Sequence, residues 1–565
     1  QWTAPLLASR REPGVIYHGS NVLLRSADGG ETWQQVSPDL TRNDKEKQQW
    51  SGGPITGDNT GVEIYDTIFS LAESPHAEGE LWAGTDDGLV HVTRDGGANW
   101  ANITPSGMPE WATVESIALS GATAGTAWIA VDAHRLDDLR PYVFRTRDGG
   151  LTWDLAIQGL PPTAYVLVVR EDPVVPGLLY AGTRFGLFLS RDGGDRWEAF
   201  KLNLPPVVVT DLEVKNGDLV VATSGRSLWI LDDLSAVRAW GSEAAAQPLR
   251  LFPTRPAERL QLQNGWSAEA VGENPPRGAI VHYSLATKAE GEVILEVFDG
   301  EGRRVRRLSS IPEPQIYPQD DPDEPMKEPE AVLQTAAGLH RAIWDLRWEG
   351  ARRLENAKVD LGDPTVGPLA IPGTYRLRLT AGGRTEETVL NVLADPRSRV
   401  SAADLAAQLD FALELRADVD RVVAGVGELR EIQAQTRDLA KRLAGDGRAA
   451  GLIQAAKRAG EIAAALEARF HNPRAEIVYD ILAQRGGTQL HSNLTFLYIS
   501  ALWGEGAPTQ GMKEVAAELE ALLLGLERQL LELKSGDLAE LERQARELNL
   551  PRVLLRKSIE AEELE

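Results

Sequence analysis

The sequence predicts a mainly β fold with an α-helical C-terminal region, and three observations lead to this prediction. An octapeptide centred on Asp-Gly-Gly and closed by Trp recurs four times within residues 1–240, which indicates β-propeller blades. Residues 241–397 alternate in the way that is typical of a β-sandwich. Residues 398–565 carry apolar side chains in steps of three and four, which predicts a helical hairpin or bundle.

The four octapeptides mark successive repeats. Their aspartates are 67, 53 and 44 residues apart, close to the roughly 40–50 residues of a four-stranded blade. A fifth unit, residues 219–233, has the strand pattern without the octapeptide. The sequence therefore predicts five blade equivalents, four of which carry the octapeptides Ser26–Trp33, Thr93–Trp100, Thr146–Trp153 and Ser190–Trp197.

Each residue type in the octapeptide suits a structural role. Asp-Gly-Gly supplies the positive φ angles of a tight hairpin turn, and the carboxylate can accept backbone N–H groups across that turn. The Ser or Thr hydroxyl can bond back into the turn, and the indole packs a large apolar area against the sheet. Because one such turn stands at the outer side of each blade, we expect a scaffolding role for Asp28, Trp33, Asp95, Trp100, Asp148, Trp153, Asp192 and Trp197.

The middle part of the chain is expected to form an immunoglobulin-like or fibronectin-like sandwich. Strand-like alternation runs through residues 278–309 and 338–394, with a hairpin turn at residues 299–302. Between these stretches, residues 311–330 are rich in Pro, Asp and Glu, which is typical of a solvated loop. A calcium site is the alternative interpretation of this acidic run.

The last part is predicted to be helical from Ser401, whose hydroxyl can cap a helix. An apolar stripe follows the cap and needs a partner helix to cover it. The candidates for that partner are residues 449–470 and residues 513–533. The second candidate opens after Pro508 and is expected to end near Ser535.

Composition excludes several classes of partner. With 59 Lys and Arg against 83 Asp and Glu, the net charge of −24 disfavours nucleic acid and anionic lipid surfaces. The absence of cysteine excludes disulfides, thiolate metal sites and cysteine nucleophiles. No apolar stretch reaches the ~20 residues of a membrane span. The chain starts at Gln1 without a signal-peptide pattern, so we expect a processed chain or a fragment.

No cofactor and no metal are expected from the motifs. The sequence lacks a Gly-rich phosphate loop and a Gly-x-Ser-x-Gly elbow. Its eight histidines show no close pairing in the sequence. The nearest approach to a cluster is Asp132 with His134, next to Asp137 and Asp138.

Candidate site residues come from loops at one mouth of the propeller. The turns after the second strand of a blade contain Asp86, Asp87, Arg184 and Arg226, and an insertion before the second blade adds Glu63, Tyr65 and Asp66. A glycosidase needs two carboxylates roughly 5–10 Å apart, so the catalytic candidates are Glu63, Asp66, Asp86 and Asp87. The ligand-binding candidates are Tyr65, Arg184 and Arg226. The alternative for each of these residues is a structural role, in a common turn or as a brace between blades.

Longer segments resemble a known family. Residues 36–43, 81–88 and 224–233, together with the octapeptides and the order of the three parts, are similar to bacterial BNR (Asp-box) repeat proteins of the sortilin/Vps10-like propeller type, often labelled glycosyl hydrolases. The resemblance implies further blades upstream, or a partner chain, that close the ring and cover its edge strands. It also implies an extracellular or periplasmic location.

Three functions are compatible with this pattern. The leading expectation is an exported binding or scaffold protein that recognises a protein segment or a glycan, because the architectural motifs are complete and no catalytic motif is present. The alternative is a glycoside hydrolase, sialidase-like or polysaccharide-cleaving, that uses paired carboxylates. A structural subunit of a larger complex is the third, and it agrees with the implied missing blades.

Overall fold

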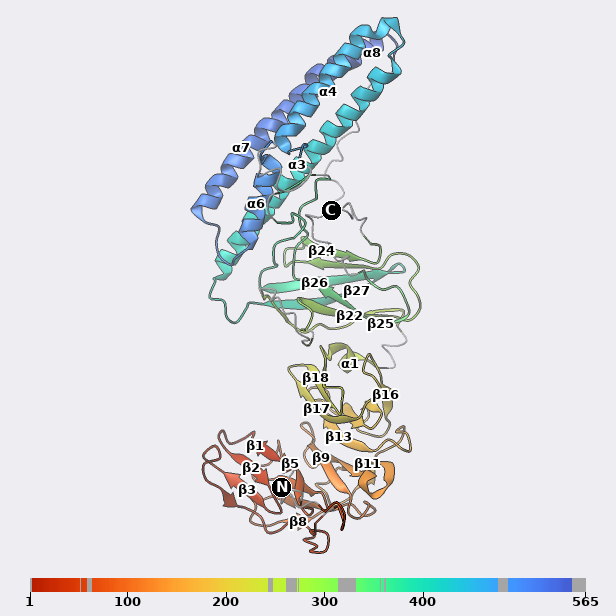
Figure 1. Cartoon of the computed structure of the whole chain (residues 1–565), viewed down its shortest axis with the longest axis vertical. Helices are drawn as coiled ribbons and strands as arrows, with labels where there is room; N and C mark the ends of the chain where they lie inside the picture. The colour runs from red at the N-terminus through yellow and green to blue at the C-terminus, as the bar shows by residue number, and fades with distance from the viewer. Residues whose placement is uncertain are drawn as a thin grey trace. The chain divides into compact units, whose positions relative to one another are not determined.

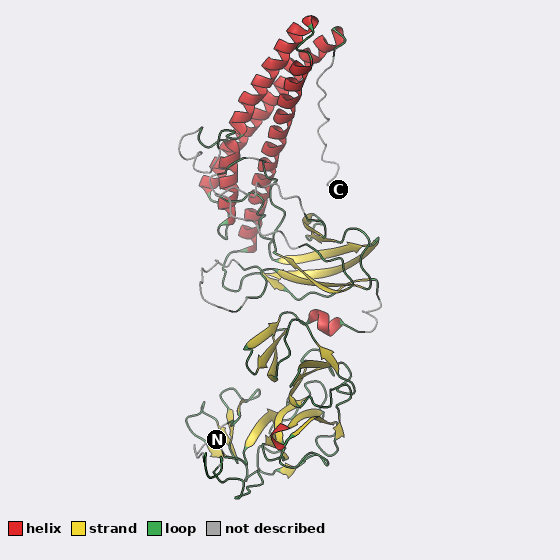
Figure 2. Cartoon of the chain, turned by 45° about the vertical axis from the view of Figure 1, so that its right-hand side comes forward, coloured by secondary structure: helices red, strands yellow, loops and turns green. Residues whose placement is uncertain are grey.

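The computed structural model contains two compact units, Gln1–Arg238 and Ala239–Glu565. The structure describes residues 3–50, 52–57, 64–241, 247–260, 272, 274–312, 332–355, 357–359, 362–475 and 486–550. Glu63 and almost all of the acidic segment 311–330 lie outside the described residues. Strands fill the first unit and the beginning of the second, and helices follow in the rest of the second unit (Figure 2).

The first unit contains five small antiparallel sheets in the order of the sequence (Figure 1, red to yellow). Within each sheet the strands form an up-and-down meander, so consecutive strands are hydrogen-bonded neighbours. The sheets consist of β1 (Leu6–Ala8), β2 (Ile16–Gly19), β3 (Leu23–Ser26) and β4 (Gln34–Gln35); β5 (Ile68–Glu73), β6 (Leu81–Thr85), β7 (Val90–Thr93) and β8 (Ala101–Asn102); β9 (Thr113–Leu119), β10 (Ala127–Ala133), β11 (Asp138–Thr146) and β12 (Asp154–Leu155); β13 (Val166–Glu171), β14 (Leu179–Thr183), β15 (Gly186–Ser190) and β16 (Glu198–Phe200); and β17 (Val209–Lys215), β18 (Asp218–Thr223) and β19 (Leu228–Leu231).

The first strands of successive sheets lie beside one another. β5 contacts β9, β9 contacts β13, and β13 contacts β17. Each of these four strands shifts register by one residue against the second strand of its sheet, at Phe69, Glu115, Leu167 and Thr210. A bulge of this kind re-aims one side chain of the strand. The four bulge residues therefore occupy equivalent positions in four neighbouring sheets.

The octapeptide turns join the third and fourth strands of the first four sheets. In the third sheet, the Thr146 hydroxyl donates to the Asp148 carboxylate at 2.8 Å and accepts the backbone N–H of Gly150 at 3.0 Å. Asp148 also accepts the backbone N–H of Thr152 at 2.9 Å. Gly150 has a φ of 90°, in the region that favours glycine. Each aspartate is thus engaged by its own turn, and the first, second and fourth turns repeat these bonds.

The second unit begins with two sheets that share one hydrophobic core. One has the order β20-β22-β25 and the other the order β21-β27-β26-β23-β24, in which β21 and β27 are parallel and the other pairs antiparallel. The strands are β20 (Leu249–Leu251), β21 (Ala257–Glu258), β22 (Ala279–Leu285), β23 (Ile294–Phe298), β24 (Arg304–Ser309), β25 (Gly338–Trp344), β26 (Gly373–Ala381) and β27 (Arg384–Leu393). Within the described residues of 345–372, where the sequence predicted strands, the pairing is a single bridge between Arg347 and Leu369.

Helices complete the second unit around a larger apolar core and a smaller one, and the buried residues of the last helix belong to the smaller core. They are α3 (Ala402–Arg442), α4 (Ala450–Phe470), α6 (Leu490–Leu502), α7 (Gln510–Leu533) and α8 (Ala539–Glu547). Ser401 caps α3, since its hydroxyl accepts the backbone N–H of Asp404 at 3.1 Å. With 41 residues, α3 is roughly 60 Å long, and α4 and α7 run along it (Figure 1).

Two helical features differ from the sequence prediction. The chain does not leave the helix at Ser535, because a π-helical segment, Lys534–Leu538, carries it into α8. Leu538 is buried in the larger helical core, and the Lys534 ammonium pairs with Glu428 of α3 at 2.8 Å. Helix α6 was not predicted: it is buried on almost all sides, so its sequence shows no amphipathic stripe.

Candidate functional site

Two kinds of loop meet at one end of the sheets in the first unit. One leads into the first strand, and the other joins the second and third strands. Backbone N–H groups of the second loop donate to carbonyls of the first, from Asp86 to Thr67 at 2.9 Å and from Arg184 to Tyr165 at 3.1 Å. We call this end the rim. It comprises residues 65–67, 86–89, 111–113, 132–137, 163–165, 184–185, 208 and 224–227, and the octapeptide turns stand at the opposite end because the third strand reverses direction.

Asp86 links both loops of the second sheet. Its carboxylate accepts the backbone N–H of Thr67 at 2.7 Å and the Thr67 hydroxyl at 3.0 Å. Its carbonyl accepts the hydroxyl of Thr113, at the start of the third sheet, at 3.4 Å. Burial raises the pKa of Asp86 to about 6 in spite of the hydrogen bonds from Thr67. Asp86 therefore braces the second sheet against the third.

Asp66 and Asp87 form a buried pair of carboxyl groups, 1% and 0% exposed. Asp87 accepts the backbone N–H of Arg42 at 2.6 Å and the hydroxyl of Thr85, while Asp66 accepts an amide N–H of Gln48 at 2.8 Å. Burial raises the pKa of Asp87, hydrogen bonds from Thr85 and Arg42 oppose the rise, and the Asp66 carboxyl adds to it. The pair holds the loop after the first sheet against the second sheet.

Tyr65 packs on Trp111, whose ring also faces two cations. The two rings stack with centroids 6.0 Å apart, and the Tyr65 hydroxyl donates to the Trp111 carbonyl at 2.7 Å. The Arg42 guanidinium lies 4.8 Å and the Lys47 ammonium 4.5 Å from the centroid of the Trp111 ring. Burial and then the Asp86 carboxylate raise the pKa of Tyr65, so its hydroxyl stays protonated as a donor.

Glu115 is the bulge residue of β9, and sequence reasoning did not single it out. Its side chain is 13% exposed and forms a long ion pair with Arg135, with 3.7 Å between the oxygen and the nitrogen. Burial and the Asp132 carboxylate raise the pKa of Glu115 to about 7, although Arg135 opposes the rise. A carboxyl group with such a pKa can donate or accept a proton at neutral pH.

Asp132 and His134 stand next to Glu115 and connect the third sheet to the fourth. Asp132 is 2% exposed and accepts the backbone N–H of His134 at 3.0 Å. The second Asp132 oxygen contacts Nδ1 of the same histidine, which places the ring proton on that nitrogen. The His134 ring stacks on Tyr165 with centroids 4.7 Å apart. Asp138 belongs elsewhere, since it pairs with Arg140.

Arg184 and Arg226 occupy the rim turns of the fourth and fifth sheets. The Arg184 guanidinium lies 5.2 Å from the centroid of the Phe185 ring, which is 42% exposed. Arg226 is exposed, and its carbonyl accepts the indole N–H of Trp229 at 2.9 Å. Within the described residues neither guanidinium has a carboxylate partner. Arg226 is thus exposed to solvent, whereas Arg184 is partly buried with its guanidinium over the Phe185 ring.

The structure places six of the seven candidate residues at the rim and separates them by environment. Tyr65 and the three aspartates form hydrogen bonds to protein groups, whereas the two arginines have no carboxylate partner within the described residues. The sequence did not single out Glu115, because no residue pattern around it indicates burial or a functional role. A single Glu in an apolar strand usually marks a solvent-facing position, and a bulge is not visible in one sequence.

The rim offers carboxyl, aromatic and guanidinium groups. Across the part of the chain that the structure describes, no three His, Asp or Glu side chains are arranged to hold a metal ion. None of the described helices is long and apolar enough to cross a membrane.

Comparisons with known proteins give distant structural likenesses. No protein-family model and no curated protein matches the chain. Similar solved structures include YCF48 bound to D1 peptide (19% identity, 29% of this chain, 51% of that chain, TM-score 0.24), an ancestral GH74 enzyme (14%, 69%, 46%, TM-score 0.29), and the GH74 xyloglucanase from Xanthomonas campestris (14%, 70%, 66%, TM-score 0.33). The chain spans about half the length of the first two of these structures. At these TM-scores the likeness carries no inference about function.

Proposed function

We propose that this chain is a propeller-type binding or scaffold protein whose rim recognises a protein segment that carries carboxylates. One observation supports the proposal: the rim of the third, fourth and fifth sheets presents basic side chains, two of which lie against aromatic rings. His134 stacks on Tyr165, Arg184 lies over Phe185, and Arg226 stands exposed in the turn whose backbone carbonyl accepts the Trp229 indole N–H.

The chemistry of this row suits an anionic, extended ligand. A guanidinium binds a carboxylate through two parallel N–H···O bonds, and such charge-assisted bonds are roughly twice as strong as neutral ones. The Phe185 ring beside the Arg184 guanidinium adds apolar contact area. Because the whole chain carries a net charge of −24, an acidic segment needs this local positive charge to approach.

The finer architecture belongs to the same proposal. The five sheets are blades of an Asp-box propeller, and the two packed sheets of the second unit are its immunoglobulin-like sandwich. Upstream blades or a partner chain complete the propeller, and the resemblance to Asp-box proteins implies an exported protein. The helical region then serves assembly, since α3, α4 and α7 form a long packed bundle and its described residues hold no cluster of metal ligands.

A glycoside hydrolase is the second candidate, and Glu115 favours it. A carboxyl group with a pKa of about 7 can act as a general acid, and the Asp132 carboxylate is close to it. Three contacts favour binding instead. Asp132 is held by His134, and Asp66 and Asp87 bond to the protein itself, so none of these carboxylates is free to reach a sugar.

The test compares two fluorescent peptides, one of alternating glutamate and tyrosine and one of alternating glutamine and tyrosine. We expect the acidic peptide to bind more tightly in anisotropy titrations. Arg184→Gln and Arg226→Gln should each weaken its binding about tenfold, since losing one charge-assisted contact costs about 1.4 kcal/mol. Arg196→Gln is the matched control, because Arg196 is exposed in an octapeptide turn at the opposite end of the sheet.

A second arm addresses the hydrolase. The full chain is incubated with a glycan panel, and released reducing sugar is measured. Turnover that disappears in Glu115→Gln would support the hydrolase and contradict the binding proposal. Equal affinity for both peptides, or an equal loss in the Arg196→Gln control, would also contradict it.

A further inference from the structure

The sheets of the first unit are linked by a recurring hydrogen bond. The indole N–H of each octapeptide tryptophan after the first donates to a backbone carbonyl of the preceding sheet. The acceptor is the third residue after the preceding octapeptide tryptophan, just beyond the fourth strand. The three pairs are Trp100 to Val36 at 3.1 Å, Trp153 to Ile103 at 2.8 Å, and Trp197 to Ala156 at 2.9 Å.

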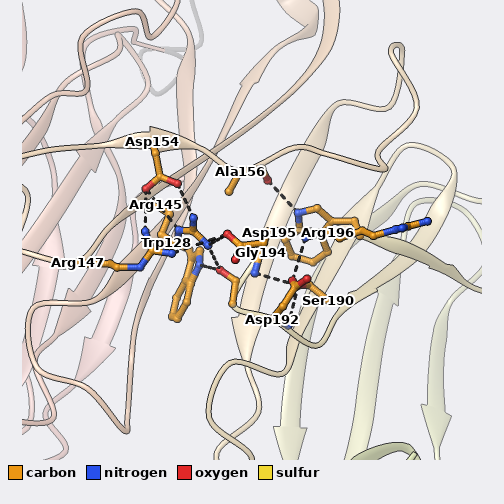
Figure 3. A network of polar contacts seen from close by, with 12 residues as sticks. Trp128, Arg145, Arg147, Asp154, Ala156, Ser190, Asp192, Gly194, Asp195 and Arg196 are labelled. Carbon is orange, nitrogen blue, oxygen red and sulfur yellow. Dashed lines mark hydrogen bonds and ion pairs between the residues drawn. The ribbon is translucent and has the colours of Figure 1, made fainter. Parts of the chain in front are cut away.

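Figure 3 shows this interface between the third and fourth sheets. The Trp197 indole donates to the carbonyl of Ala156, and a Cβ on Gly194 of the octapeptide would be in van der Waals contact with the Ala156 Cβ, at 3.4 Å. Arg145 of the third sheet adds an ion pair to Asp195 of the fourth sheet at 2.7 Å. Trp197 is consequently only 2% exposed.

The second glycine of the octapeptide is packed more tightly in the second and third sheets. A Cβ on Gly97 would overlap the Val36 carbonyl, and one on Gly150 would meet the Ile103 side chain. These glycines are therefore needed for the close approach of the preceding sheet, in addition to their turn geometry. Tryptophan and glycine together define a face that receives the end of a fourth strand.

The first sheet has the same face without an occupant in the described structure. The Trp33 indole donates to Gly30 of its own turn at 3.0 Å, and the residue is 41% exposed. The nearest atoms to a Cβ on Gly30 belong to Trp33 and Ile16, both in the first sheet. Leu6 of β1 is 68% exposed. We call Leu6, Gly30 and Trp33 the Trp33 face.

We propose that the Trp33 face binds a further four-stranded repeat sheet, whose carbonyl just beyond its fourth strand accepts the Trp33 indole N–H. This inference deepens the partner part of the proposed function and does not depend on what the rim binds. It rests on continuity with the three interfaces already formed, since the same residue types present the same groups in the same order.

The same geometry argues against the chain's own fifth sheet, or that of a second copy, as the occupant. The fifth sheet has three strands in the described residues, β17, β18 and β19, so it presents no carbonyl beyond a fourth strand. The equivalent carbonyls of the first three sheets already accept an indole. In the fourth sheet the equivalent residue is Phe200, the last residue of β16, and its side chain packs against the core that the fourth and fifth sheets share. A complete repeat from elsewhere is required.

The experiment adds such a repeat to the full chain. A copy of residues 64–112, the second repeat, is placed ahead of Thr3. The carbonyl of the copied Ile103 can then accept the Trp33 indole N–H, as the Ile103 carbonyl accepts that of Trp153. The protein is labelled with 5-fluorotryptophan, and the Trp33 fluorine signal is assigned with Trp33→Phe. Relaxation by a soluble gadolinium chelate then measures the accessibility of Trp33. We expect this accessibility to fall to the level of Trp153.

Two controls make the result decisive. A matched chain carries residues 201–233, the three-stranded fifth sheet, at the same position and should leave Trp33 accessible. A second version of the test uses residues 113–164, which supply the Ala156 carbonyl, and should protect Trp33 as the first version does. The double variant Arg184→Gln, Arg226→Gln should leave the Trp33 signal unchanged. A failure of peptide binding at the rim can therefore be distinguished from a failure of the Trp33 face to bind a repeat.

Three results would overturn the proposal. Trp33 could stay as accessible in both four-stranded versions as in the unmodified chain, whether or not the added residues fold. The three-stranded control could protect it equally. The unmodified chain could protect Trp33 as its concentration rises, which would make a second copy the occupant.

Discussion

Replacing an octapeptide tryptophan by phenylalanine removes the indole donor and keeps an aromatic ring. In Trp197→Phe, the Ala156 carbonyl loses a donor at 2.9 Å in an interface where the tryptophan is 2% exposed. An unsatisfied buried acceptor costs about 1–3 kcal/mol, and the smaller ring adds about 1 kcal/mol for the space it leaves. We therefore expect the free energy of unfolding to fall by about 2–4 kcal/mol.

Trp33→Phe is the matched comparison. Its indole bonds within its own turn, and the residue is 41% exposed, so water can replace the lost donor. The expected loss is below about 1 kcal/mol. Because the chain has two compact units, stability is best read by hydrogen exchange of the first unit's strands in a urea series. An equal or larger loss for Trp33→Phe would refute the inter-sheet role of the other tryptophans.

Three further predictions concern buried ionisable groups. The folded-state pKa of Glu115, about 7, lies above the ordinary 4.5, so the free energy of unfolding falls as pH rises between these values. Glu115→Gln should remove this pH dependence in urea unfolding and raise the free energy of unfolding by up to about 3 kcal/mol at pH 8. The same pH dependence in the variant and the original chain would contradict this. In Arg238→Met, the buried Asp172 carboxylate loses its ion pair with Arg238 at 3.0 Å, and the free energy of unfolding should fall by about 2 kcal/mol. An unchanged melting temperature would contradict a stabilising role for this ion pair. Burial opposes ionisation of Glu467, but hydrogen bonds, led by that from His471, lower its pKa to about 2, so stability is lost as pH falls from 4.5 to 2; Glu467→Gln should flatten that acid limb in circular dichroism, and an unchanged limb would contradict it.

Features decided by neighbouring residues could be predicted from the sequence. The octapeptide turn depends on groups within four positions of Asp148, and the start of α3 depends on Ser401 three positions before Asp404. Both are local hydrogen-bond patterns, so one sequence is enough to recognise them. The small antiparallel sheets and the helical C-terminal region follow from the same kind of periodic pattern.

Features decided by distant residues could not be predicted. Asp66 and Asp87 looked available for chemistry, but their environment depends on Gln48 and Arg42, which the fold brings to them from the preceding loop. The raised pKa of Glu115 comes from burial at a strand bulge, which no local pattern marks. Helix α6 lacks an amphipathic stripe because neighbouring elements cover it on almost all sides.

Hydrogen exchange of the full chain, with and without the glutamate–tyrosine peptide, tests the binding account most directly. The account predicts slower exchange on binding at the rim turns of the third, fourth and fifth sheets, residues 134–137, 184–185 and 224–227. It predicts unchanged exchange at the octapeptide turns. Protection confined to the octapeptide turns, or rim turns that exchange equally in both states while the peptide is bound, would contradict the account.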